Sequence, residues 1–132
     1  MNYVLDTNII IHIMTGAATV KQNRDKATDD GGRFIIPTVV NYEVMRGLII
    51  KSIPKYDKIY DSLRANCTIE SVTDDVWNRA AEVYAELYHK RFTVADADIL
   101  IAAFCLVNGY RLVTDNTNDF KNIDGLDFVN WV

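Results

Sequence analysis

Acidic residues that can bind a metal ion recur in four short segments spread along the chain. They are Asp6 within 3–8, Glu43 within 38–43, Asp96 and Asp98 within 95–103, and Asp115 and Asp119 within 112–120. Each lies where an apolar run begins or ends, which is where a fold projects side chains into a shared cleft. Carboxylates repel one another, so their convergence requires a cation between them. Hard oxygen ligands suit Mg²⁺ or Mn²⁺, and the pattern therefore predicts a divalent metal site.

The spacing of apolar residues predicts the elements that position these acids. Short apolar runs predict strands at residues 2–5, 34–36, 68–72, 111–114 and 127–130. Helical spacing predicts helices at residues 7–14, 39–50, 73–90 and 99–108, with Thr38 and Thr73 as N-caps of the second and third. A further helix is expected to begin at Pro54, and a variable helix is expected within 15–32. Strands that alternate with helices indicate a mostly parallel sheet covered on both faces, which is an α/β sandwich.

This order of elements brings the acidic segments to one edge of the sheet, because functional residues gather at the carboxyl ends of parallel strands. Asp6 and Asp115 each directly follow a predicted strand. Glu43 lies within the first two turns of the helix after the second strand. Asp98 lies in the opening turn of its helix, where the helix dipole favours an anion.

Each acid also has a purely structural interpretation. Asp6 can be the N-cap of the helix at 7–14, and Glu43 can face solvent. Within the pair at 96 and 98, the first is the expected helix cap and the second the expected ligand. Asp119 can be a turn acid, and Asp115 a strand-end acid facing water. The joint placement of all of them at junctions favours the metal site.

Composition narrows the class of protein. The chain has 132 residues, of which 49% are hydrophobic and 24% charged, so we expect one soluble globular domain. Its net charge of −4 argues against a nucleic-acid coat protein, although an enzyme acting on nucleic acid remains compatible. The longest apolar runs are too short to cross a bilayer, and residues 1–6 contain no basic segment, so we expect a cytoplasmic protein with no membrane contact.

The cysteines and histidines indicate neither a zinc site nor a catalytic acid–base pair. Cys67 and Cys105 are expected to be reduced core thiols. His12 and His89 share no zinc-ligand spacing with either cysteine, and we interpret both histidines as surface or packing residues rather than as an acid–base couple.

Five motifs together resemble one known family from residue 3 to residue 131. They are Tyr3-Val-Leu-Asp-Thr-Asn8, Glu43-x-x-x-Gly47, Asp96-x-Asp98-x-Leu-Ile-Ala-Ala103, Leu112-Val-Thr-x-Asn116-x-x-Asp-Phe120 and Gly125-Leu-x-x-x-Asn130-Trp131. In this order they resemble PIN-domain ribonucleases and, more narrowly, the VapC toxins of bacterial VapBC toxin–antitoxin pairs. The resemblance implies a single PIN domain over residues 1–132, folded as an α/β/α sandwich around a mostly parallel sheet of about five strands.

The resemblance also implies an activity, namely Mg²⁺-dependent endoribonuclease chemistry, with Mn²⁺ as a substitute, that leaves a 5′-phosphate and a 3′-hydroxyl. Asp6 and Asp98 correspond to the metal ligands and Glu43 to the third acid. The fourth acid is either Asp119 or Asp115, with Asp119 favoured. The residues that orient these acids are Thr7, Asn8, Asp96, Thr114 and Asn116.

The same resemblance implies partners. A cognate VapB antitoxin is expected to cover the cleft by docking on the helices at 38–66, and the chain is expected to form a homodimer. Arg46 is a candidate contact for substrate or antitoxin. The expected substrate is transfer RNA, including the initiator tRNA, or ribosomal RNA.

Two other functions compete with this one. The first is a catalytically silent PIN-like module that only binds RNA or protein, although such a module has no need to keep mutually repelling carboxylates. The second is a phosphoaspartyl enzyme with Asp6 as nucleophile. The corresponding phosphatase pattern requires a second aspartate where this chain has Asn8, so we rank it last.

Overall fold

Five parallel strands form one central sheet in the computed structural model, which describes residues 1–132. The strands lie in the order β3-β2-β1-β4-β5, with bounds β1 (Asn2–Leu5), β2 (Arg33–Pro37), β3 (Thr68–Glu70), β4 (Arg111–Val113) and β5 (Phe128–Val129). The first strand is central, and its Val4 pairs with Ile35 of β2 on one side and Leu112 of β4 on the other. The predicted α/β class is confirmed, and the sheet is wholly parallel.

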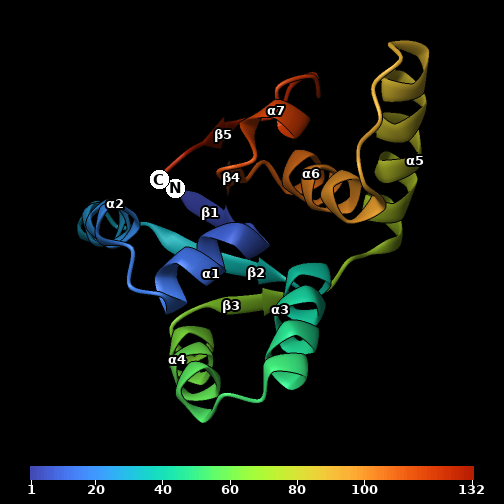
Figure 1. Ribbon diagram of the computed structural model, residues 1–132. Coiled ribbons are helices and arrows are strands. Elements are labelled where there is room, and N and C mark those ends of the chain that lie inside the picture. The colour runs from blue at the N-terminus through green and yellow to red at the C-terminus, as the bar shows by residue number, and fades with distance from the viewer.

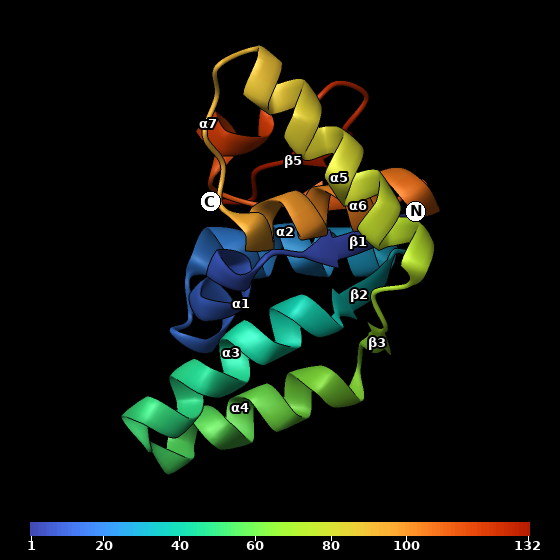
Figure 2. The same cartoon turned by 90° about the vertical axis from the view of Figure 1, so that its right-hand side faces the viewer.

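Helices connect successive strands. Their bounds are α1 (Thr7–Met14), α2 (Ala18–Asp29), α3 (Thr38–Lys51), α4 (Pro54–Ala65), α5 (Asp74–His89), α6 (Asp96–Asn108) and α7 (Thr117–Phe120). The ribbon shows α5 packed beside α6, while α3 and α4 form a hairpin that extends beyond β3 (Figure 1). The turned view shows the same hairpin at the opposite end of the molecule from α7 (Figure 2). None of these helices combines the length and the apolar character needed to cross a membrane.

The packing of the core explains why the central strands are continuous apolar runs in the sequence. Val4 and Leu5 of β1 and Leu112 and Val113 of β4 are completely buried, because parallel strands in the middle of such a sheet are covered on both faces. These side chains belong to one cluster of 28 buried residues, to which α6 contributes a nearly continuous buried stretch from Ile101 to Cys105. The acidic junctions therefore project from a rigid, close-packed base.

The structure corrects two predicted helix caps. Thr38 is not an N-cap, because Pro37 ends β2 in an extended conformation and α3 begins at the next residue. The Thr38 hydroxyl instead accepts a hydrogen bond from the backbone N–H of Val72 at 3.2 Å. Asp96 is not a cap either, because α6 begins with it, Ala95 is the N-cap, and no side chain bonds the first turn.

The other expected boundaries hold more closely. Thr73 caps α5 through the N–H of Val76, and Pro54 lies in the first turn of α4. The predicted third and fifth strands are shorter than expected, ending at Glu70 and Val129. Both cysteines are free thiols, as predicted, but only Cys105 lies in the core, whereas Cys67 is partly buried against it.

Candidate active site

Asp6 lies at the junction of β1 and α1, and it is both a helix cap and a buried acid. Its side chain is only 3% exposed. One carboxylate oxygen accepts from the N–H of Thr7 at 2.8 Å, which caps α1. The other accepts from the Thr114 hydroxyl at 2.7 Å and from the Asn8 amide at 3.2 Å. The capping and ligand interpretations of Asp6 are therefore compatible, since three neutral donors hold the carboxylate in one orientation.

Glu43 reaches the same edge from the second turn of α3. Its Oε1 accepts from the Thr7 hydroxyl at 2.8 Å, so Thr7 contacts Asp6 with its backbone and Glu43 with its side chain. Arg46, one turn further along α3, lies 3.6 Å from the other oxygen of Glu43. The Arg46 guanidinium also lies over the Tyr42 ring, 5.2 Å from its centroid.

Asp98 completes the group from the first turn of α6. The pKa of Asp98 is raised to about 7, mainly by burial and then by the charges of Asp6, Asp119 and Glu43. Asp119 lies in α7, where the Asn116 amide donates to it at 2.8 Å. The charges of Asp6, Glu43 and Asp119 thus act on Asp98 from the β1–α1 junction, α3 and α7, and the charge of Glu43 also acts on Asp6.

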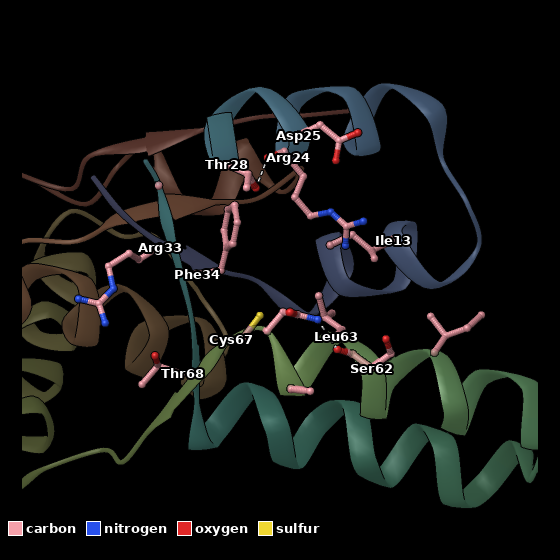
Figure 3. Close-up of a pocket in the computed structure, with 14 residues that line it drawn as sticks. Ile13, Arg24, Asp25, Thr28, Arg33, Phe34, Ser62, Leu63, Cys67 and Thr68 are labelled. Carbon is pink, nitrogen blue, oxygen red and sulfur yellow. Dashed lines mark hydrogen bonds between the residues drawn. The ribbon is translucent and has the colours of Figure 1, made fainter. Parts of the chain in front are cut away.

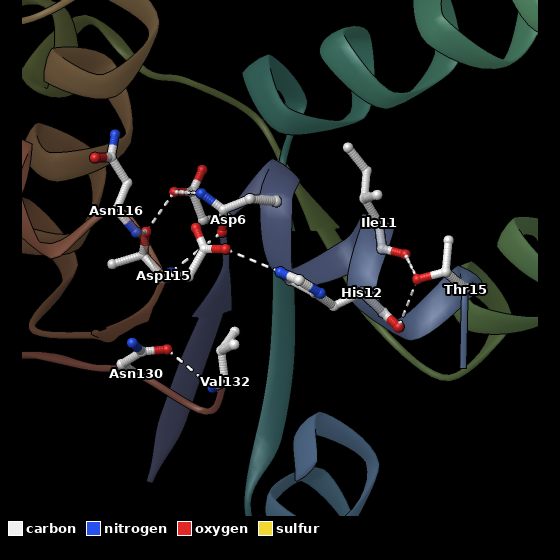
Figure 4. Close-up of polar contacts among 10 residues, drawn as sticks. Asp6, Ile11, His12, Thr15, Asp115, Asn116, Asn130 and Val132 are labelled. Atoms are coloured by element: carbon white, nitrogen blue, oxygen red, sulfur yellow. Dashed lines mark hydrogen bonds and ion pairs between the residues drawn. The ribbon is translucent and has the colours of Figure 1, made fainter. Parts of the chain in front are cut away.

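Asp115 has different neighbours. Its Oδ2 lies 2.9 Å from Nε2 of His12 on α1, and its backbone N–H donates to the Asn8 side chain at 3.3 Å. Figure 4 shows Asp115 pointing toward His12. Asp115 is not among the charges that raise the pKa of Asp98. Of the two candidates for the fourth acid, only Asp119 acts on the charge of Asp98.

Polar neighbours of the acids form a connected set. The Thr114 hydroxyl donates to Asp6 and accepts from the N–H of Asn116, whose amide then bonds Asp119. Thr114 is completely buried. Asp96, by contrast, is exposed on the first turn of α6. Four of the expected orienting residues donate to the acids, namely Thr7, Asn8, Thr114 and Asn116, whereas the Asp96 side chain makes no such bond.

The donor set fits a divalent cation with an open coordination shell. Burial raises the pKa of Asp6, hydrogen bonds from Thr114 and Thr7 oppose that shift, and the charge of Glu43 adds to it. No three histidine, cysteine or acidic side chains are arranged as ready ligands of one metal ion. Mg²⁺ commonly uses one or two carboxylates and keeps several water molecules, so the buried Asp6 and the half-buried Asp98, whose carboxylates repel each other, suit it.

The largest cavity lies away from these acids. It measures about 820 Å³ and lies among α1, α2, α4 and the starts of β2 and β3. Figure 3 shows Arg24 reaching from α2 toward Ile13 and Leu63, with Phe34 inside the opening. We call this cavity the α2–α4 groove. A second, smaller hollow of about 100 Å³ lies between α1, α3 and α4 and is lined in part by Thr7 and Glu43.

Two features of the region escaped the sequence reasoning. The contact between His12 and Asp115 joins residues 103 positions apart, whereas the sequence predicts only a surface or packing role for His12. The available signal was the spacing of Asn8 and His12, which puts both side chains on one face of α1. The α2–α4 groove combines residues from distant segments, and no local pattern marks it.

Comparison with known proteins defines the class. A family model described as PIN domain matches residues 3–126. "Ribonuclease VapC1" of Rickettsia felis is 31% identical over 133 residues, covering 96% of this chain and 94% of the relative. "Ribonuclease VapC" of Rickettsia bellii is 30% identical over 141 residues, with the same coverage of both chains.

Solved structures share the fold. A chain of the VapBC2 complex of Rickettsia felis, bound to a promoter DNA fragment, has a TM-score of 0.92 and 24% identity, with 100% of both chains covered. A DNA-bound VapBC complex of Salmonella typhimurium has a TM-score of 0.87 and 21% identity, covering 100% of this chain and 99% of that chain. This protein therefore belongs to the PIN-domain family and, within it, to the VapC proteins.

Proposed function

We propose that the protein is a Mg²⁺-dependent endoribonuclease and the toxin of a VapBC-type pair, built as one PIN domain over residues 1–132 and acting in the cytoplasm. The observation that carries this proposal is the convergence of Asp6, Glu43, Asp98 and Asp119, which raises the pKa of Asp98 to about 7 through burial and charge repulsion. Its relatives named Ribonuclease VapC support the same activity.

Each acid has a distinct part in this mechanism. Asp6 and Asp98 would hold the ion, and Mg²⁺, or Mn²⁺ in its place, stabilises charge on a phosphodiester and activates water in sites of this kind. Glu43 is oriented by the Thr7 hydroxyl and is placed to accept a proton, a function that Asp98 can share. Asp119 is the fourth acid, supported by its coupling to Asp98.

RNA is the substrate that we assign to this site, with transfer RNA, including the initiator tRNA, as the expected class. Arg46 supports a phosphate contact because it is the basic group next to Glu43 and its side chain is 55% exposed. A guanidinium at this position can bind a phosphate through two hydrogen bonds. Ribosomal RNA is the alternative substrate, and loop contacts would decide between the two.

A VapB-type antitoxin is the proposed protein partner, and the α2–α4 groove is the docking site that the structure supports best. Its apolar lining includes Ile59 and Leu63 of α4, within the 38–66 region expected to bind the antitoxin. Arg24 of α2 supplies a cation at the opening. An antitoxin segment with an apolar side chain for the groove and an acidic residue for Arg24 would match it.

A homodimer is the proposed assembly. The outer face of α5 exposes three aromatic side chains, Trp77 by 56%, Tyr84 by 53% and Tyr88 by 67%. The rings of Tyr84 and Tyr88 stack with centroids 6.4 Å apart. Exposed aromatic clusters of this kind mark protein interfaces, and a two-fold axis would pair the face with itself.

The decisive experiment compares RNA cleavage by the purified protein with that of Asp6→Asn and Asp98→Asn. The proposal expects cleavage that EDTA stops and Mg²⁺ restores, and a loss of about 10³-fold in either variant. Asp124→Asn is the matched control, because it makes the same chemical change in a side chain that is 78% exposed. Undiminished cleavage in both site variants would overturn the proposal. RNA binding without cleavage by the native protein would favour the silent module.

A further inference from the structure

We infer that His12 is a positioning residue that, together with Asn8, holds residue 115 and so sets the path of the segment carrying Asp119. This inference rests on the proposed function, since it concerns how the fourth acid is placed. It assigns Asp115 to α1 rather than to the carboxylate group.

The geometry is a contact at two points from one helix face. Asn8 and His12 are four residues apart on α1, so their side chains lie one above the other. Asn8 accepts from the backbone N–H of Asp115 at 3.3 Å, while His12 lies 2.9 Å from its carboxylate. Asp115 is thus held through both its backbone and its side chain, and this fixes the direction of the chain as it leaves β4.

The segment that follows depends on this direction. Thr114 bonds Asp6, Asn116 bonds Thr114, and the Asn116 amide bonds Asp119. Phe120, at the end of α7, is completely buried and anchors the C-terminal end of this segment. Between these two anchors, His12 forms the only side-chain to side-chain bond from α1 to residues 115–120.

The contact also limits the negative charge at the site. Both partners are about one third exposed, so the carboxylate of Asp115 has room to move when His12 is absent. A released Asp115 would bring a further negative group toward four acids that already repel one another. Holding it against α1 keeps the four-acid geometry intact.

The first test reads the segment directly and needs no activity. Hydrogen–deuterium exchange is followed in a peptide covering residues 112–122 for the native protein and for His12→Ala, His12→Gln and His89→Ala. Loss of the bond should speed exchange in this peptide about fivefold in His12→Ala. Glutamine can donate to Asp115 in place of the imidazole, so His12→Gln should stay within twofold of native. His89→Ala, an exposed histidine on α5, is the matched control.

The second test separates positioning from ligation by kinetics. His12→Ala and Asp115→Ala should each lower kcat about 30-fold with KM for RNA within twofold, because small misplacements reduce kcat steeply. Asp115→Asn keeps an acceptor for His12 and should retain most activity. The double variant His12→Ala/Asp115→Ala should be no worse than either single variant, because both changes break one contact.

The outcomes separate clearly. If Asp115→Asn is as damaged as Asp115→Ala while His12→Ala is active, Asp115 is a ligand and the inference is wrong. Equal exchange and equal kinetics in all variants would also overturn it. If the native protein cleaves no RNA, the proposed function fails, and the exchange experiment still decides whether His12 orders the segment.

Discussion

The edge that carries the acids and the α2–α4 groove differ in charge, in space and in the kind of side chain that lines them. At the acidic edge, neutral donors bond the carboxylates of Asp6, Glu43 and Asp119, and the charges of all three raise the pKa of Asp98. The groove has about 820 Å³ of space, and its lining mixes apolar side chains such as Ile59 and Leu63 with polar and charged ones, among them Arg24. The first region is the proposed site of a metal ion, and the second is the proposed docking site of an antitoxin segment. Catalysis and its control are therefore expected to respond to different substitutions.

The substitution Glu43→Gln is expected to give the largest difference between its effect on RNA cleavage and its effect on antitoxin affinity. Removing the acid that Thr7 orients should lower RNA cleavage about 10³-fold, because the proton acceptor is lost while the side-chain shape is kept. Single-turnover cleavage of a labelled RNA measures the effect. Affinity for the antitoxin, measured by calorimetry, should change less than threefold. A large loss of antitoxin affinity would show that the two regions are one interface.

The reverse pattern is expected from Ile59→Asp in the groove. A buried charge facing an apolar partner should weaken antitoxin binding about 30-fold, with RNA cleavage by the free protein within twofold of native. Binding by calorimetry and cleavage without antitoxin are measured on the same preparation. Lys58→Asp is a neighbouring control on α4, outside the groove. Equal antitoxin affinity in native protein and Ile59→Asp would exclude the groove as the docking site.

A smaller effect is expected from Thr7→Val. This change removes the 2.8 Å hydrogen bond to Glu43 and preserves the shape of the side chain. Cleavage should fall about fivefold, as expected for the loss of one orienting bond. The backbone N–H of Thr7 remains, so the cap on α1 is retained and the melting temperature should change little. A loss as large as that of Glu43→Gln would mean that Thr7 itself contacts the substrate.

The smallest effect is one of stability and depends on pH. The pKa of Asp98 is about 7 in the folded protein and lies near its usual acidic value in the unfolded chain, so the folded state binds the extra proton between these values. Stability from this group therefore falls as pH rises from about 4 to 7. In EDTA, Asp98→Asn should melt about 4 °C above native at pH 8 and close to native at pH 5. Thermal scans at both pH values measure this, and the opposite ordering would contradict the assigned repulsion.

Sequence reasoning located the acids because each one ends or begins an apolar run, and such runs become buried strands and helices. It failed at single-residue detail. Thr38 and Asp96 were both assigned as caps, but a junction sequence does not reveal at which residue the helix starts. Tertiary packing decided this, since Pro37 carries β2 directly into α3.

Long-range contacts could not be predicted from the sequence for a different reason. His12 and Asp115 are 103 positions apart, and neither has a local pattern that points to the other. The exposed face of α5 was similarly hidden. Six apolar residues of α5 fit the spacing of a helix, but only four of them, Val76, Ala80, Val83 and Leu87, are buried, whereas Trp77 and Tyr84 are exposed. Periodicity predicts an apolar stripe, whereas packing decides how wide a stripe the partner helix covers.

The central position of β1 has a consequence for synthesis of the protein. Asp6 is made among the first residues, but its Thr114 partner lies 108 positions later, and β1 lacks one of its two neighbours until β4 has been made. A nascent chain that already contains Asp6, Glu43 and Asp98 therefore has no assembled site. We expect the ability to cleave RNA to arise only when nearly the whole chain has left the ribosome.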